Sequence, residues 1–154
     1  ALVDIACSGA QAGFSLMITP SRRTPTELMQ ALREALADLP PERCFIWDGA
    51  GENPYVAMLA NADCIVVTAD SVNMVGEAAA TGAPVYLYEP AGGSPKITRF
   101  LGAMIASGAV RRFEGAFERW TYQPIDATQE IASEVARRYM ARKASLPPKA
   151  RRAE

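Results

Sequence analysis

Short apolar runs alternate along this chain with longer segments in which apolar residues recur every three or four positions. Short runs of this kind are typical of strands, and the longer spacing is typical of amphipathic helices. The runs predict strands at 14–19, 44–47, 64–68 and 85–88, with an edge strand at 110–113. The periodic segments predict helices at 2–12, 24–39, 53–62, 70–81, 94–107 and 127–142. Because strands and helices alternate, we predict an α/β fold, a Rossmann-like three-layer αβα domain with a mostly parallel sheet.

The stretch from Ala62 to Pro90 carries this pattern most clearly. Its first apolar run is rich in β-branched residues, which is typical of a strand buried on both faces of a parallel sheet. Asp70 is the expected N-cap of the helix that follows, Ser71 is a weaker alternative, and Gly82 supplies the stop. A second apolar run then completes a βαβ unit.

The helix in this unit sorts its side chains to two sides, because each residue turns it by about 100°. The side expected to face the sheet carries Val72, Val75, Gly76 and Ala79. The outward side carries Asp70, Asn73, Met74 and Glu77. The N–H groups of the first turn lie at the carboxyl end of the sheet, where a helix N-terminus favours a phosphate. An ordinary capped helix with a solvated glutamate explains the same spacing, so both interpretations stay open.

Polar turns also follow the other predicted strands. The turn Ser21-Arg22-Arg23 comes after the first strand, and glycine-containing turns at 48–52 and 89–93 come after two others. The carboxyl ends of parallel strands meet at one edge of a sheet, so these turns are expected to gather there. An arginine at that edge can bind a phosphate through paired hydrogen bonds, whereas a solvated polar turn is the alternative.

The helix after the first of these turns has a well-specified start. Thr24, Pro25 and Glu27 stand at the spacing of a capping box with proline at its preferred position. We therefore predict that Thr24 caps this helix, with a contribution of about 1 kcal/mol.

The composition excludes several kinds of chemistry. Histidine is absent from the 154 residues, which excludes Ser-His-Asp and Cys-His nucleophiles and histidine metal sites within this chain. Cys7, Cys44 and Cys64 lack CxxC spacing and are expected to be small core hydrophobes. We predict no metal and no cofactor, and we assign no catalytic residue.

The length suits one domain, which we place at 1–143, followed by a basic and disordered tail at 144–154. Neither an apolar run of about 20 residues nor a signal-peptide pattern is visible in the sequence, so we expect a cytoplasmic protein without a transmembrane segment. The chain opens with Ala1 in what reads as the middle of a helix, which is compatible with a piece of a longer protein.

The net charge of −1 conceals an uneven distribution. From Arg137 onward, Glu154 is the only acid among many basic residues, whereas the preceding body is acidic. Such a tail can contact nucleic acid or anionic lipid, although ordinary solvation of a helix end explains it too. The body has no basic face interleaved with aromatic residues, so we expect no nucleic-acid partner.

The chain resembles the mitochondrial-fission ELM-like family in four segments. They are ITPSRRTP at 18–25, GENPY at 51–55, ADCIVVTADSVNMVGEAAATGAPVY at 62–86 and the predicted helix at 95–108. The resemblance covers nearly the whole chain, and TADSVNMVGEAAATG is its most specific part. Bacterial members of this family are labelled predicted nucleoside-diphosphate-sugar epimerases. The family is in turn similar to GT-B glycosyltransferases and UDP-GlcNAc 2-epimerases, in which two Rossmann-like domains face a cleft.

The resemblance implies that this chain is the nucleotide-sugar-binding, carboxyl-terminal half of such a protein. In these proteins a Ser/Arg turn and the backbone at a helix N-terminus hold the diphosphate, and a glutamate in that helix holds the ribose hydroxyls. Carried over to this sequence, the diphosphate residues are Ser21, Arg22, Arg23, Asp70, Ser71, Val72 and Asn73, and the ribose residue is Glu77. The implied ligand is an NDP-sugar, in the first place a UDP-sugar.

The partner implied by the resemblance is an amino-terminal domain that this sequence lacks. In GT-B enzymes that domain binds the acceptor and commonly supplies the catalytic base, so this half alone is expected to bind rather than turn over. Plant members of the family are associated with recruiting fission machinery to mitochondria, which makes a non-catalytic interaction or scaffold domain the alternative. An absent partner domain would leave apolar surface exposed, which is compatible with a homo-oligomer.

Overall fold

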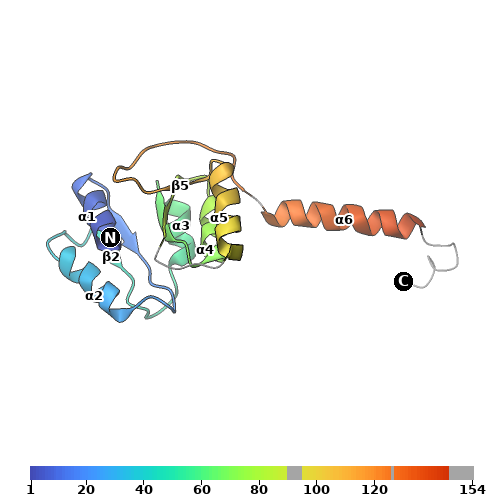
Figure 1. Cartoon of the computed structure of the whole chain (residues 1–154). Coiled ribbons are helices and arrows are strands. Elements are labelled where there is room, and N and C mark those ends of the chain that lie inside the picture. Colours follow the sequence, from blue (N-terminus) through green and yellow to red (C-terminus); the bar gives the residue numbers. More distant parts are fainter. Residues whose placement is uncertain (90–94, 126, 146–154) are drawn as a thin grey trace.

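Helices and strands alternate along the whole described chain (Figure 1). The computed structural model describes residues 1–89, 95–125 and 127–145. The elements are α1 (Leu2–Gln11), β1 (Leu16–Ile18), α2 (Thr26–Ala35), β2 (Cys44–Ile46), α3 (Tyr55–Asn61), β3 (Ile65–Thr68), α4 (Val72–Ala79), β4 (Val85–Tyr88), α5 (Pro95–Ala106), β5 (Val110–Arg112) and α6 (Ala127–Ser145). The predicted α/β fold with a Rossmann-like αβα arrangement is confirmed, and each predicted strand exists within a residue or two of its expected position.

The strands pair in parallel, as predicted, and they do so in two groups. β1 pairs with β2, and β4 lies between β3 and β5. Within the described residues, no ladder of hydrogen bonds joins β1 to β3. We call the boundary between the two groups the seam. Figure 1 shows α1 and α2 beside the first group and α3, α4 and α5 beside the second.

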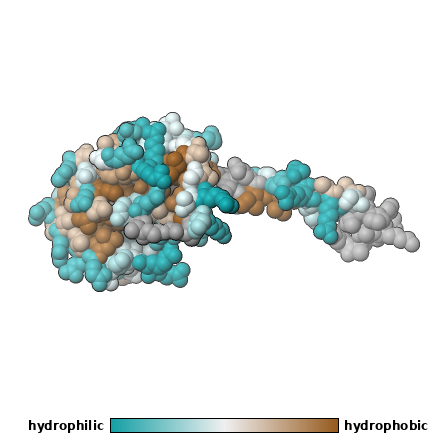
Figure 2. Space-filling model, in the orientation of Figure 1, coloured by the Kyte–Doolittle hydropathy of each residue, from teal (hydrophilic) through white to brown (hydrophobic). Residues whose placement is uncertain are grey.

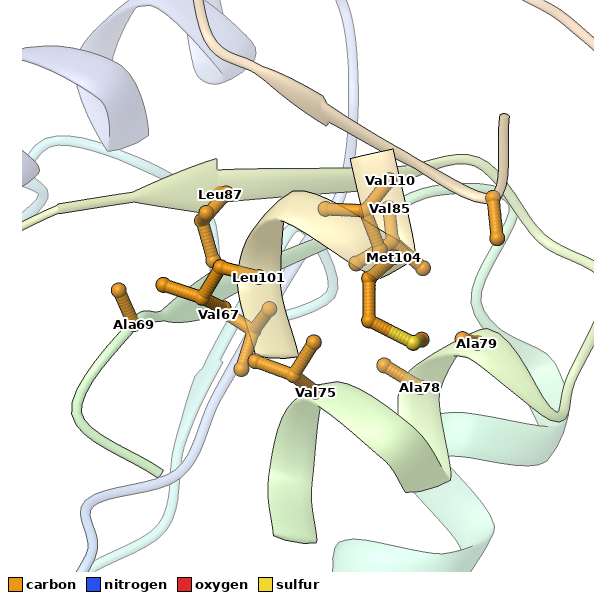
Figure 3. Packing of buried hydrophobic residues seen from close by; sticks show 11 residues of the cluster. Val67, Ala69, Val75, Ala78, Ala79, Val85, Leu87, Leu101, Met104 and Val110 are labelled. Atoms are coloured by element: carbon orange, nitrogen blue, oxygen red, sulfur yellow. The ribbon is translucent and has the colours of Figure 1, made fainter. Parts of the chain in front are cut away.

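The main core lies between the β3–β4–β5 sheet and the helices α4 and α5 (Figure 3). Val75 of α4, Val85 of β4 and Val110 of β5 are completely buried. Fully burying a valine side chain contributes about 1.5–3 kcal/mol. Gly82 ends the turn after α4 with φ +83°, a left-handed conformation that glycine adopts without strain. The packed β3–α4–β4 unit therefore places the start of α4 at the carboxyl end of β3.

An aromatic cluster covers the other face of this sheet and crosses the seam. The ring of Tyr86 on β4 meets the rings of Phe113, Phe117 and Trp120 edge-on, with centroids 5.1–5.5 Å apart. Phe117 also contacts Phe14, which precedes β1, at 5.2 Å. Aromatic pairs of this geometry contribute about 0.5–1.5 kcal/mol beyond their buried area. The two groups of strands are thus joined by side chains rather than by backbone hydrogen bonds.

The helix α6 projects away from the rest of the chain (Figure 1). Its predicted apolar row, Ile131, Val135 and Tyr139, is exposed, and so is Met140. Figure 2 shows a hydrophobic patch on the part of α6 nearest the body. α6 runs to Ser145 and so includes the first two residues of the disordered tail predicted at 144–154; the rest of that tail lies outside the described residues. No helix in the described ranges has both the length and the apolar content that a membrane span requires.

Candidate functional site

Two polar turns that lie far apart in the sequence meet where β1 and β3 end. Arg23 lies in the turn after β1, and Asp70 lies in the turn between β3 and α4. Nη2 of Arg23 donates a hydrogen bond of 3.1 Å to the backbone carbonyl of Asp70 and lies 3.5 Å from its carboxylate oxygen Oδ2. The structure therefore brings together, across the seam, the two segments that carry the predicted diphosphate residues.

The turn after β1 is closed by its own hydroxyl groups. The N–H of Ser21 donates to Oγ1 of Thr24 at 2.8 Å, and the N–H of Arg23 donates to Oγ of Ser21 at 3.2 Å. Thr24 therefore does not cap α2, which begins at Thr26 with Pro25 as its N-cap and without a side-chain cap hydrogen bond. The predicted capping box is wrong because the threonine hydroxyl is already bonded within the turn.

The start of α4 is open. Its N-cap is Ser71, the alternative named from the sequence, and not Asp70. No side chain in the described ranges forms a cap hydrogen bond there, so the N–H groups of Val72 and Asn73 remain available to an acceptor, whereas that of Ser71 donates to the carbonyl of Thr68 at 3.4 Å. The carboxylate of Asp70 lies beside Arg23 instead. A helix N-terminus with free N–H groups attracts anions, and here the nearest acid is partly neutralised by a cation.

The burial of α4 follows the predicted two-sided pattern with some differences. Val75 and Ala79 are buried against the sheet and Asn73 and Glu77 are exposed, as expected. Val72 was expected to face the sheet but keeps 36% of its surface exposed, because it lies in the first turn of the helix, beyond the end of β3. Met74 was expected to face outward but packs against the core.

Glu77 accepts a hydrogen bond from a residue that was not predicted to belong to the site. The hydroxyl of Tyr55, the first residue of α3, donates a hydrogen bond of 2.7 Å to Oε2 of Glu77. Burial raises the pKa of Tyr55 well above its ordinary value, and the hydrogen bond and negative charge of Glu77 raise this pKa further. The phenol thus stays protonated and acts as the donor. One indication of this role was present in the sequence, because Tyr55 stands at the start of a helix, at the edge of the sheet where the site lies.

A shallow groove runs beside Glu77 between α3 and α4. It is lined by Val56, Leu59, Ala60, Ala62, Glu77, Ala80, Thr81 and Ala83. Most of these side chains are small or apolar, and Glu77 supplies the charge in the lining. Glu77 therefore lies between an apolar groove and the open start of α4, one and a half turns along the same helix.

The predicted polar turns at 48–52 and 89–93 contribute fewer described contacts to the site. The turn at 48–52 is closed on itself, since the N–H of Ala50 donates to Oδ1 of Asp48 at 2.9 Å. Of the predicted turn at 89–93, only Glu89 is described, and it forms an ion pair of 2.7 Å with Arg112. Arg22 is exposed and forms no ion pair with any residue in the described ranges.

The acidic and cysteine side chains that could bind a metal lie apart in the described ranges. The described part of the chain contains no cluster of three or more potential ligands among histidine, cysteine, aspartate and glutamate. Cys7, Cys44 and Cys64 are free thiols that are partly buried, and burial raises the pKa of Cys44 and Cys64. A raised thiol pKa disfavours the reactive thiolate at these two positions, but none of the three cysteines belongs to the buried core in which they were expected.

Comparison with known proteins relates the chain to one family. The family described as "Mitochondrial fission ELM1" matches residues 2–139. The chain is 38% identical over 135 residues to "Mitochondrial fission protein ELM1" of Arabidopsis thaliana, covering 86% of this chain and 31% of that protein. It is 32% identical over 123 residues to "Uncharacterized protein RP120" of Rickettsia prowazekii (strain Madrid E), covering 75% of this chain and 34% of that protein.

Two further findings concern solved structures and the length of these relatives. No solved structure matches the chain. The chain spans about a third of the length of each of these relatives. The family match covers almost every described element from α1 to α6 and includes both turns that meet at the seam. The chain therefore belongs to the mitochondrial fission ELM1 family.

Proposed function

We propose that this chain is the nucleotide-sugar-binding domain of a longer GT-B-like protein, either a glycosyltransferase or a nucleoside-diphosphate-sugar epimerase. The observation that carries the proposal is the contact between Arg23 and Asp70 beside the uncapped start of α4. Two turns and a helix N-terminus that converge at the carboxyl edge of parallel strands form the usual setting of a phosphate-binding site in α/β proteins.

In this proposal the diphosphate lies against the start of α4. The backbone N–H groups of Val72 and Asn73 supply donors without the cost of desolvating a charged side chain. Ser21 and Arg22 face the ligand from the opposite turn. Arg22, which has no ion pair with a described residue, binds a phosphate oxygen, while Arg23 stays with Asp70 and keeps that acid from repelling the ligand.

Glu77 in this proposal accepts hydrogen bonds from the ribose hydroxyls. It is exposed and lies on the same helix as the diphosphate site. A carboxylate that accepts a hydroxyl hydrogen bond forms one of the stronger kinds of polar contact, worth about 1.5–3 kcal/mol.

Turnover in this proposal requires a second domain. We propose that residues 1–143 form the carboxyl-terminal half and that an amino-terminal domain outside this chain binds the acceptor and supplies the catalytic groups. The relatives are about three times as long as the matched region, which leaves room for such a domain. A cytoplasmic location and a basic tail at 144–154 remain part of the proposal.

Titration calorimetry with UDP, UDP-GlcNAc and other NDP-sugars tests the proposal. We expect the wild-type chain to bind, and we expect Glu77→Ala to weaken binding by about ten- to a hundredfold. Glu42→Ala is the matched control because it removes an exposed glutamate just before β2, at the opposite edge of the sheet. Absence of heat for every ligand, with the chain alone and with a longer protein that includes the preceding region, would overturn the proposal.

A second candidate is a non-catalytic interaction domain. The observation that favours it is the exposed apolar row on α6, Ile131, Val135 and Tyr139, together with a plant relative named for mitochondrial fission. This candidate predicts that a partner protein is captured by the wild type and by Glu77→Ala, and is lost when Ile131 and Val135 are replaced by serine. Capture that depends on Glu77 would argue against it.

A further inference from the structure

The Tyr55–Glu77 pair joins two helices at the edge of the sheet where the proposed ligand lies. Tyr55 is the first residue of α3, and its N–H is held by Oδ1 of Asn53 at 3.0 Å. Glu77 lies in the second half of α4, which packs against the core through the fully buried Val75. Both ends of the 2.7 Å hydrogen bond are therefore anchored by the fold.

The two carboxylate oxygens of Glu77 differ in their hydrogen bonding. Oε2 accepts from Tyr55, whereas Oε1 accepts no hydrogen bond from any residue in the described ranges. Tyr55 is half-buried and remains a neutral donor, so Glu77 must be the acceptor. A glutamate side chain that is exposed and unheld samples many rotamers, and ordering it costs binding free energy.

We infer that Tyr55 is a positioning residue that holds Glu77 with one carboxylate oxygen free, and thereby makes the site selective for ribonucleotides over 2′-deoxyribonucleotides. This inference rests on the proposed function. A ribose diol offers two hydroxyl donors, and a carboxylate held in one orientation can meet both of them only in one geometry. A 2′-deoxy sugar lacks one donor and leaves part of the oriented carboxylate without a partner.

The test compares paired nucleotides with four proteins. The probes are UDP, GDP and ADP, each measured against its 2′-deoxy form. The proteins are the wild type, Tyr55→Phe, Glu77→Gln and the control Tyr122→Phe. Tyr122 is also half-buried and donates a similar hydrogen bond of 2.8 Å, to the carbonyl of Ala83 beyond the far end of α4. Tyr122→Phe thus reproduces the loss of a phenol hydrogen bond away from the proposed ligand.

We expect Tyr55→Phe to weaken ribonucleotide binding about three- to tenfold and to leave the 2′-deoxy affinity nearly unchanged, so that the ratio of the two falls. Glu77→Gln should reduce the ratio at least as much, and Tyr122→Phe should preserve it. The ratio is the decisive readout because general destabilisation would lower both affinities together.

The outcomes separate the inference from the proposed function. A Tyr55→Phe variant that keeps the wild-type ratio, whether or not both affinities fall together, while Glu77→Gln loses the ratio, would overturn the role of Tyr55 in selectivity and leave the nucleotide site intact. A wild type that binds no nucleotide would overturn both.

Discussion

The contact between Arg23 and Asp70 leads to a prediction in which one substitution weakens ligand binding and a second restores it. Arg23→Ala should leave the fold nearly unchanged, because the pair is exposed, with 66% and 44% of the two side chains accessible. Exposed ion pairs typically contribute about 0–1 kcal/mol to stability. The substitution should nevertheless weaken the binding of UDP, since it leaves the charge of Asp70 uncompensated beside the start of α4.

The expected loss follows from Coulomb's law. A carboxylate about 6 Å from a diphosphate carrying about two negative charges repels it by about 1.4 kcal/mol in a water-like dielectric. That repulsion corresponds to about a tenfold weaker Kd at low salt, and screening at physiological ionic strength reduces the effect. Asp70→Asn added to Arg23→Ala removes the repulsion and should bring the affinity back to within about threefold of the wild type.

Titration calorimetry at low and at physiological salt measures both effects, with thermal unfolding as the check on the fold. If the affinity of Arg23→Ala stayed at the wild-type value, Asp70 would not lie near the ligand and the diphosphate would have to bind elsewhere. If the double variant stayed as weak as Arg23→Ala, the guanidinium of Arg23 would contact the ligand directly instead of neutralising Asp70.

Two further predictions concern the fold and its ionisation. Val75→Ala should lower the free energy of unfolding by about 2–3 kcal/mol, since it removes two methyl groups from a completely buried site. Val72→Ala, on the same helix but 36% exposed, should change this free energy by less than about 0.5 kcal/mol. Chemical denaturation measures both values. Tyr55 has a raised pKa in the fold, so its contribution to stability is fully present below about pH 10 and is lost as the pH rises through the folded-state pKa. Phenolate absorbance should show Tyr55 ionising at lower pH in Glu77→Gln, and an unchanged titration would mean that burial alone raises this pKa.

The βαβ unit around α4 was predictable because its signals are local. β-branched residues mark β3, Gly82 marks the turn, and the strand Val85–Tyr88 has the bounds that its apolar run predicted. The outward positions of Asn73 and Glu77 also followed from helical spacing alone. Each of these predictions depends only on a few neighbouring residues, so the sequence alone is sufficient for it.

The details of the candidate site depend on contacts that sequence spacing does not encode. Asp70 and Arg23 are 47 residues apart, and Asp70 contacts Arg23 while Ser71 is the N-cap of α4. Glu77 and Tyr55 are 22 residues apart on separate helices. Thr24 failed as a cap because a nearer partner, Ser21, takes its hydroxyl. Capping and pairing are competitions among polar groups, and the tertiary arrangement decides which partner is nearest.

The seam gives the candidate site a mechanical property. One of its halves is carried by β1 and the other by β3, and the described structure holds the two together through Phe117 at one place and through Arg23 at another. A few side-chain contacts constrain two segments less than a ladder of backbone hydrogen bonds does, so we expect the distance between the two turns to vary more than the spacing of paired strands. A diphosphate bound to both turns would act as a brace between them, and the rigidity of the empty and the occupied domain would differ most at β1 and β3.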